Sequence, residues 1–436
     1  MFEDFAREWS AVRADKATAV FQVDSLEDAF EALAGMSELD VGVKRDTLVE
    51  MLLAGWEHEP GDSVADVINA VTAVHLLQDI DDWQRQRFEE AARLRDMLQA
   101  LSIMSAPPEI LSVSAKAAEE LRAERAFDPF PNVDGIFALA HGTGCGMAAS
   151  GPGWDNLQRV LWGYATHPNV GAAIFVGLGC EVMQIERMKS LFGVGGSERF
   201  HGLTIQETGG TRKTIDRIKA MVRDYLPGVD AARRSECPAS DLVVALQCGG
   251  SDGMSGITAN PALGAASDML VGLGATTVLA ETPEIYGAEH LLTRRAVSEA
   301  VGKKLVDRIE WWENYTRINS GSMDNNPSPG NKKGGLTTIL EKSLGAAAKG
   351  GTTPLTGVYK YAEPVTEPGL AFMDSPGYDP CSITGQVASG ANVVCFTTGR
   401  GSVYGCKPAP SLKLATNSTM FRRMDARPLS TAGSAM

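Results

Sequence analysis

Apolar residues follow two patterns along the chain, and the pattern changes once near its start. At first they recur at spacings of three and four, for example in 25–33 and 82–101, which is typical of amphipathic helices. Pro107 and Pro108 then interrupt any helix, because proline lacks a backbone donor and disfavours the helical conformation of the preceding residue. We therefore predict a helical accessory domain over residues 1–105.

The rest of the chain alternates short, continuously apolar runs with longer helical stretches. The apolar runs are 135–140, 172–178, 242–246, 276–279 and 392–396, and the helical stretches include 154–164, 214–225 and 296–317. Strands that are apolar on both faces are buried on both faces, so this alternation indicates a largely parallel sheet covered by helices. The sequence predicts an α/β fold of largely parallel sheets flanked by helices, with one α/β domain over 106–236 and a second over 237–436.

Polar, glycine-rich segments follow all five apolar runs. They begin at His141, Gly177, Gln247, Glu281 and Thr397. Open parallel sheets bind ligands beyond the carboxyl ends of their strands, because loops from separate βα units converge there. We therefore expect the five segments to form one site.

Three of these segments carry a cysteine. Thiolate, imidazole and carboxylate groups suit a first-row transition metal, and three cysteines would also suit an iron–sulfur cluster with one open iron. Each cysteine alone could equally be a small buried residue at a crowded strand end. We interpret Cys145, Cys180, Cys248 and Glu181 as metal ligands. His141 directly follows the first run and suits proton transfer or metal binding, although a lone histidine is as often structural.

Charged residues mark the remaining segments. Glu281 and Glu284 could act as acid and base or bind a divalent cation, and the alternative is a solvated loop edge. Arg400 and Lys413 could clamp an acidic substrate, since arginine offers a planar fork and lysine a compact charge. Ordinary salt bridges remain open for either residue.

Composition excludes several classes of function. The chain has 54 acidic and 40 basic residues and no dense basic stretch, so we expect no nucleic-acid partner. No apolar run reaches the ~18 residues that cross a bilayer, and the start of the chain is acidic, so we expect a cytoplasmic protein without a membrane partner. The 7 cysteines lack a dense spacing framework and are expected to be thiols, ligands or core residues. No strand is followed by the glycine pattern of a nucleotide site.

Six separated strings resemble the altronate/galactarate dehydratase family, which also contains the large subunit of sulfolactate sulfo-lyase. The strings are 141–147, 167–169 with 177–181, 248–261, 281–289, 372–400 and 408–417, in family order. The resemblance implies a dehydration assisted by Fe²⁺ or Mn²⁺ that turns a small 2,3-dihydroxy acid into a 2-keto-3-deoxy acid. It implies that His141, Cys145, Glu281 and Glu284 are catalytic. It implies a substrate-binding set that consists of Ser251, Asp252, Thr258, Asn260, Arg400, Lys413 and Asn417.

The chain departs from the family pattern at the first core strand. Family members usually carry an Arg-Asn motif and a further cysteine there, whereas 111–115 offers only serines. The small N-terminal domain of the sugar-acid enzymes is not recognisable in residues 1–105. Two alternatives therefore stay open: a carbon–sulfur lyase of the sulfolactate type, and an inactive family member that acts as a binding subunit. The resemblance also implies a homo-oligomer and leaves room for a separate small subunit.

Overall fold

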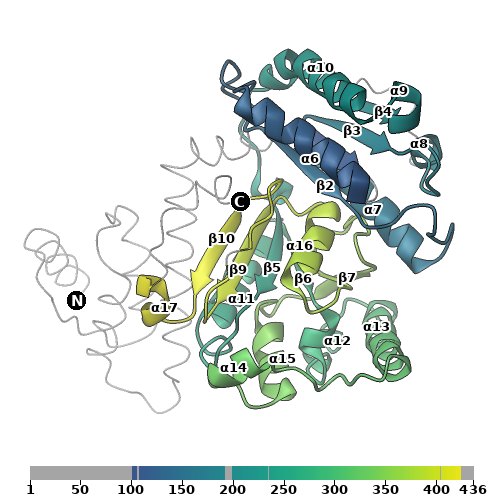
Figure 1. The fold of residues 1–436 in the computed structure, drawn as a ribbon. Helices are drawn as coiled ribbons and strands as arrows, with labels where there is room; N and C mark the ends of the chain where they lie inside the picture. Colours follow the sequence, from purple (N-terminus) through teal and green to yellow (C-terminus); the bar gives the residue numbers. More distant parts are fainter. Residues whose placement is uncertain (1–100, 106–107, 192–198, 234, 403, 424–436) are drawn as a thin grey trace, which may run out of the picture.

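The computed structural model describes residues 101–105, 108–191, 199–233, 235–402 and 404–423. Two sheets, both parallel throughout, organise this part of the chain (Figure 1). Almost all of the predicted N-terminal helical domain lies outside the described residues. None of the described helices is both long and apolar enough to span a bilayer.

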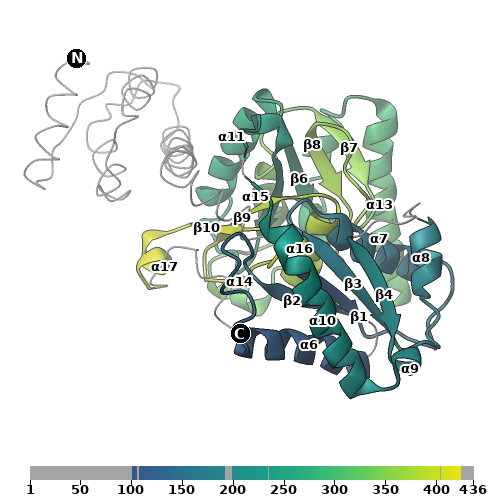
Figure 2. The same cartoon turned by 90° about the horizontal axis from the view of Figure 1, so that it is seen from above.

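The first sheet has four strands in the order β2-β1-β3-β4. Their bounds are β1 Leu101–Ser105, β2 Ile136–Ala140, β3 Ala172–Gly177 and β4 Phe200–Thr204. Two helices, α6 (Pro108–Ala123) and α10 (Thr211–Asp230), run side by side over its outer face, which Figure 2 shows from above. Val113, Ala117 and Leu121 are fully buried on one side of α6, at the spacing of four that an amphipathic helix requires.

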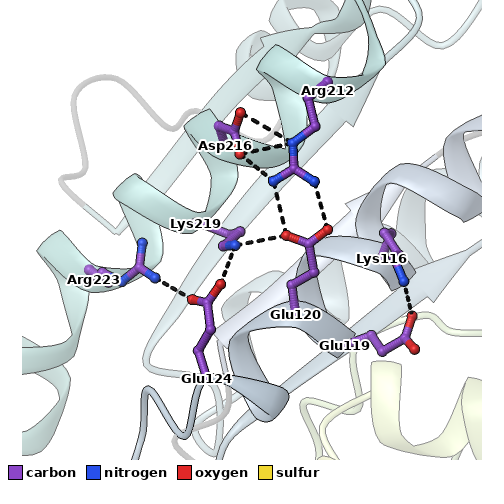
Figure 3. A network of polar contacts seen from close by, with 8 residues as sticks. All are labelled: Lys116, Glu119, Glu120, Glu124, Arg212, Asp216, Lys219 and Arg223. Atoms are coloured by element: carbon purple, nitrogen blue, oxygen red, sulfur yellow. Dashed lines mark hydrogen bonds and ion pairs between the residues drawn. The ribbon is translucent and has the colours of Figure 1, made fainter.

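An ion-pair network joins these two outer helices (Figure 3). The Arg212 guanidinium donates to both carboxylate oxygens of Glu120 over 2.8 and 3.0 Å, and Lys219 donates to the same carboxylate over 2.7 Å. Glu124 pairs with Lys219 and Arg223 one turn further on. The hydrogen bonds from Arg212 and then Lys219 lower the pKa of Glu120 to about 2, so the network is charged at neutral pH.

The second sheet has six strands in the order β10-β9-β5-β6-β8-β7. Their bounds are β5 Val243–Cys248, β6 Thr276–Ala280, β7 Leu355–Tyr359, β8 Gly369–Met373, β9 Val393–Thr398 and β10 Ser411–Ala415. The chain passes from β5 to β6 on one side and returns to β9 on the other. The carboxyl ends of β5 and β9 therefore flank the point where strand order reverses, which is where such sheets bind ligands.

Helices cover both faces of the second sheet. On one face lie α11 (Ala259–Gly272), α13 (Glu299–Ile318) and α15 (Ile339–Ala348), whose leucines and alanines pack on β5, β6 and β8. On the other face α16 (Asp379–Ala388) packs against α7 (Pro152–Thr166) of the first unit (Figure 1). One hydrophobic core, which includes Phe137, Phe175, Val387 and Phe396, spans this contact and joins the two units.

The remaining helices are short. They are α8 (Ile185–Leu191), α9 (Ile205–Thr208), α12 (His290–Thr293), α14 (Pro329–Lys333) and α17 (Ser418–Arg423), with the 3₁₀ turns η1 (Ala239–Asp241) and η2 (Thr282–Ile285).

The structure confirms the predicted α/β class, and each of the five apolar runs and three helical stretches coincides with an observed element. One expectation near the start of the core was wrong. Residues 111–115 belong to the helix α6 and not to the first core strand, which is β1, Leu101–Ser105. Pro108 begins α6, where its missing donor has no cost.

Candidate active site

A pocket of about 740 Å³ opens at the carboxyl ends of β5, β6, β8 and β9. Segments directly after these strands line it, and residues of the segment between α13 and α15 complete the lining. The polar and charged side chains of the lining include Cys248, Ser251, Glu281, Glu284, Asp379, Arg400, Asn326, Asn331 and Lys342. Its place at the reversal of strand order agrees with the site expected for an open parallel sheet.

Close backbone approaches bring the loops after β5 and β9 together. The carbonyl of Gly250 accepts hydrogen bonds from the backbone of Gly399 (3.2 Å) and Arg400 (2.8 Å). Gly250 has a φ of 61°, and a Cβ there would lie 2.9 Å from the carbonyl oxygen of Gly401. A side chain at this position would push the two loops apart, so glycine is required.

A buried lysine lies beneath the pocket. Cys248 is the last residue of β5, and its Sγ lies 2.7 Å from the Nζ of Lys349, which is 0% exposed. Burial lowers the pKa of Lys349, but the negative charges that Cys248 and Glu281 carry when they are ionised act in the opposite direction, and the pKa is raised overall. Burial raises the pKa of the Cys248 thiol. Lys349, Cys248 and Glu281 are therefore buried groups whose protonation states depend on one another.

Glu281 is a buried carboxyl in the wall of this pocket. Burial, and then the neighbouring Glu284, raise its pKa to about 8, so it is protonated at neutral pH. Its backbone is left-handed, with a φ of 71°, and its N–H donates to the Ser375 hydroxyl over 3.0 Å. Its Oε2 has no hydrogen-bond partner among the described residues. A strained, protonated and partly unpartnered carboxyl at a strand end is typical of an acid that acts on a ligand.

Glu284, by contrast, is neutralised within the protein. The Nζ of Lys342 lies 2.9 Å from its Oε1 and 2.8 Å from its Oε2, and also donates to Asn326 Oδ1 over 2.9 Å. Asn326 in turn donates to Glu284 Oε1 over 2.7 Å. All three groups are therefore engaged with one another.

Asp379, at the start of α16, lies across the β5 loop. Its Oδ1 accepts a hydrogen bond from Gln247 over 3.2 Å, and burial raises its pKa. Lys413 lies behind it: its Nζ is 3.2 Å from the centre of the Phe396 ring, and burial lowers the pKa of the amine to about 8. Lys413 is not among the residues that line the pocket, so its predicted contact with substrate is not supported by this geometry.

Four other predicted substrate ligands have protein partners instead. The buried carboxylate of Asp252 accepts from Thr416 and Asn417 over 2.9 Å, which ties the loop after β5 to the end of β10. Thr258 donates to the Thr416 carbonyl over 2.8 Å, and Asn260 donates to the Gly345 carbonyl over 2.9 Å. Asp252, Thr258, Asn260 and Asn417 thus hold the loops of the pocket, while Ser251 and Arg400 line it.

The other predicted residues lie at the first sheet. His141, Cys145, Cys180 and Glu181, here called the thiol cluster, follow β2 and β3. The two sulfur atoms are 3.7 Å apart, and both cysteines are exposed. Glu181 is buried and accepts a hydrogen bond from the Gly179 N–H over 2.6 Å. Burial lowers the pKa of His141, whose Nδ1 lies 2.7 Å from the Thr143 hydroxyl. None of the four lines the pocket.

The expected single site is therefore divided between two places, because the five strand ends belong to two separate sheets. In the described part of the chain, no three His, Cys, Asp or Glu side chains gather so as to hold a metal ion. Cys248 is already engaged with Lys349, and Glu284 with Lys342. The predicted four-ligand metal set does not fit these residues, and neither does an iron–sulfur cluster, which needs three or four thiolates.

Sequence reasoning missed Lys349, Lys342 and Asp379. Lys349 carried a signal, since a charged residue stands between three alanines and two glycines. A lone lysine in such a small, apolar stretch is costly to bury unless it is paired. The other two stand in ordinary polar surroundings, so only the fold identifies them.

Comparisons with known proteins match both units. The model of D-galactarate/altronate dehydratase, C-terminal, matches residues 239–428, and that of D-galactarate dehydratase/altronate hydrolase, second domain, matches residues 103–230. Galactarate dehydratase (L-threo-forming) of Escherichia coli is 40% identical over 276 residues, which are 61% of this chain and 52% of that protein. Altronate dehydratase of Bacillus subtilis is 38% identical over 66% of this chain and 57% of that protein.

A third relative is covered more fully. The beta subunit of (2R)-sulfolactate sulfo-lyase of Chromohalobacter salexigens is 33% identical over 299 residues, which are 67% of this chain and 75% of that protein. The chain spans only about half the length of the two dehydratases. The matched segments include both the pocket and the thiol cluster.

Proposed function

Because the chain belongs to the galactarate/altronate dehydratase family, we propose that it is a hydro-lyase that removes water from a small polyhydroxylated carboxylic acid. The observation that carries this proposal is the buried carboxyl of Glu281, with a pKa raised to about 8 by burial, in a pocket at the reversal of strand order. A carboxylic acid that keeps its proton at neutral pH can donate it to a departing hydroxyl group.

The pocket supplies a base as well as this acid. Asp379 lines the same cavity, and burial raises its pKa, which suits a base, while the hydrogen bond from Gln247 acts in the opposite direction. We assign to the Asp379 carboxylate the removal of the proton at C2 of a 2,3-dihydroxy acid. The C3–O bond then breaks, the hydroxyl leaves with the proton of Glu281 as water, and the resulting enol takes a proton at C3 to give a 2-keto-3-deoxy acid. Two carboxyls with different surroundings thus divide the acid and base roles.

The charges around the pocket favour the transition state of this reaction. Removal of the C2 proton places negative charge on the substrate carboxylate, and Arg400 in the lining can accept it as a planar, bidentate partner. The Lys349 ammonium lies behind Cys248, where little water screens its charge. Fixed positive charges of this kind need no reorganisation when the substrate becomes more negative.

Product analysis tests the proposal. The full chain is incubated with D-altronate and, separately, galactarate, and 2-keto-3-deoxy acid is measured as its semicarbazone, with Glu281→Gln as the inactive variant. Keto acid formed by the native chain and lost in the variant would support a hydro-lyase. Release of sulfite from sulfolactate without keto acid from either sugar acid would contradict it and favour a carbon–sulfur lyase.

A further inference from the structure

Two cysteines of the thiol cluster lie in contact although their loops follow strands that are not neighbours. Cys145 follows β2 and Cys180 follows β3, and β1 separates these strands in the first sheet. The two Sγ atoms are 3.7 Å apart, and the Cys145 Sγ lies 3.4 Å from the Cys180 carbonyl oxygen. Both residues are exposed. The fold therefore places two accessible thiols side by side, across 35 positions of sequence.

The surroundings of the other cysteines and of the cluster itself distinguish this pair. Cys248, Cys395 and Cys406 are buried. Cys248 contacts Lys349, and the Sγ of Cys406 lies 3.2 Å from the Tyr164 hydroxyl. The thiol cluster lacks the further ligands that a bound transition metal typically has, since no three His, Cys, Asp or Glu side chains gather in this way within the described ranges. A bond between the two sulfurs needs no third side chain.

The loop after β3 holds its sulfur in place. The side-chain amide of Gln206 donates to the Cys180 Sγ over 3.6 Å, and the Gln206 backbone N–H donates to the Leu178 carbonyl over 3.1 Å. Gly179 has a φ of 120°, and a Cβ there would lie 2.5 Å from the Gln206 Oε1. Glycine at this position therefore lets the amide reach the sulfur. An amide donor there stabilises the negative charge that an attacking sulfur carries in thiol–disulfide exchange.

The loop after β2 has room to bring its sulfur closer. Cys145 lies between Gly144 and Gly146, and most of 142–150 is exposed. A Cβ at Gly142 or Gly146 would meet no atom within 4 Å. A disulfide needs a sulfur–sulfur distance of about 2 Å, so part of the present 3.7 Å must be closed. Rotation of the Cys145 side chain and a small shift of this open, glycine-rich loop can supply the movement.

We propose that Cys145 and Cys180 form a modification site, which low-molecular-weight disulfides oxidise reversibly to an intramolecular disulfide. The Cys180 thiolate attacks one sulfur of the small disulfide, whose S–S bond breaks and releases one small thiolate. Cys145 then gives up its proton, attacks the Cys180 sulfur of the mixed disulfide and displaces the second small thiol. The two cysteines together lose two electrons and two protons, and the small disulfide becomes two thiols. This site is independent of the proposed hydro-lyase reaction, since neither cysteine lines the pocket.

The new bond would join the loops after β2 and β3 across the end of β1. It would close a loop that spans 35 positions, which restricts the unfolded chain and so stabilises the first unit. The pocket lining would not change, because its residues belong to the second unit. Oxidation should therefore raise the melting temperature by several degrees with little change in turnover.

Peptide mass spectrometry after redox equilibration tests the site. The full chain, with and without a chelator, is incubated in mixtures of glutathione and glutathione disulfide, treated with an alkylating reagent and digested with trypsin. Cleavage after Arg159 places the two cysteines on different peptides. We expect these peptides to be joined in most molecules under excess glutathione disulfide and to separate again under excess glutathione, with two thiols per chain lost and regained.

Single variants assign the two roles. Cys145→Ser should stop at the mixed disulfide, so that glutathione stays attached to Cys180. Cys180→Ser should react several times more slowly at Cys145. The matched control Cys237→Ser removes a different exposed thiol and should keep the joined peptides. The rise in melting temperature should occur in the native chain and in this control, and should be absent from the other two variants.

Two results would overturn the site. One is glutathione attached to Cys145 and Cys180 of the native chain without any joined peptide, even in the most oxidising mixture. The other is protection of both thiols by bound iron or zinc until the chelator is added, which would show that the pair holds a metal ion instead.

Discussion

The thiol cluster and the pocket lie at equivalent places in two parallel sheets, yet their chemistry differs. Both follow the carboxyl ends of strands, and both contain cysteine and glutamate. In the thiol cluster the two cysteines are exposed, and the pKa of Cys145 is raised mainly by its neighbour Cys180. In the pocket, burial is the main cause of the raised pKa of Glu281 and of Cys248.

This difference shows why residue type alone did not locate the site. A thiol or carboxyl becomes an unusual acid when it is removed from water and placed beside a fixed charge. The pocket does both, because α15 brings Lys349 beneath β5 and the 3₁₀ turn after β6 buries Glu281. In the thiol cluster, by contrast, the two cysteines remain exposed to water and have no lysine or arginine partner of this kind among the described residues. We therefore expect changes in the pocket to have the larger effects.

The largest effect is expected for Glu281→Gln. Glutamine keeps the shape of the protonated side chain but cannot deliver a proton, so kcat should fall by about 10²–10⁴. Steady-state dehydration of D-altronate measures it, with Glu310→Gln as a control at an exposed position of α13. A fall of less than tenfold would remove Glu281 from the acid role and weaken the contrast between the two regions.

A second large effect is expected for Lys349→Met. Methionine leaves the buried Cys248 without its hydrogen-bond partner, which typically costs about 1–3 kcal/mol, so the free energy of unfolding should fall by that order. The activity that remains should depend on pH differently, because the pKa of Glu281 rises further without the nearby ammonium. Chemical denaturation and a pH profile measure the two effects. Lys349→Arg, which retains the charge, should restore the profile more than methionine does, and equal profiles would rule out an electrostatic role.

The raised pKa of Glu281 also predicts that the variant Glu281→Gln is more stable than the native chain, by an amount that depends on pH. Its folded-state pKa of about 8 lies above the ordinary value of 4.5, so the unfolded chain loses this proton more readily. Below pH 4.5 Glu281 is protonated in both states and does not lower the free energy of unfolding. As pH rises from 4.5 towards 8, the unfolded state loses the proton first, and the free energy of unfolding falls. Glu281→Gln should be more stable than the native chain by about 1–3 kcal/mol near neutral and alkaline pH and equal to it in acid. Thermal unfolding across pH tests this, and a constant difference would contradict the raised pKa.

The sequence predicted the framework better than the site, for a physical reason. Buried central strands such as Val243–Cys248 and Val393–Thr398 can be recognised in the sequence because their residues are almost continuously apolar. The edge strands Phe200–Thr204 and Ser411–Ala415 are partly exposed and carry His201 or Lys413, so the same criterion overlooked them.

The site depended on contacts that a local pattern cannot contain. Lys349 and Cys248 form a hydrogen bond although they are 101 positions apart in the sequence. The residues next to either one do not identify the other as its partner. Glycine-rich strand ends were found correctly, but the pattern did not show that they belong to two sheets. Three of the five ends meet at the pocket, and those beginning at His141 and Gly177 form the other cluster.

A smaller effect on turnover is expected from the thiol cluster. The double change Cys145→Ser and Cys180→Ser keeps the size of both side chains and alters nothing that lines the pocket, so kcat/KM should change less than about tenfold. The same change should remove two of the four exposed thiols of the described residues in a timed titration with a disulfide reagent. Iron and manganese are measured in the same samples. A loss of activity as large as that of Glu281→Gln, with loss of bound metal, would show that both clusters serve one reaction.

The smallest effect is expected far from either cluster, in the ion-pair network between α6 and α10. Glu120→Gln removes the carboxylate shared by Arg212 and Lys219, but hydrophobic residues such as Leu121 and Ile218 still hold the helices on the sheet. Because solvent reaches the network, the fall in melting temperature should be slight in dilute buffer and should vanish near ~1 M salt, where charges are screened within about 3 Å. Turnover should not change. A salt-independent loss of stability would instead mean that the network supports packing, and that the outer face of the first sheet depends on charge as strongly as the pocket does.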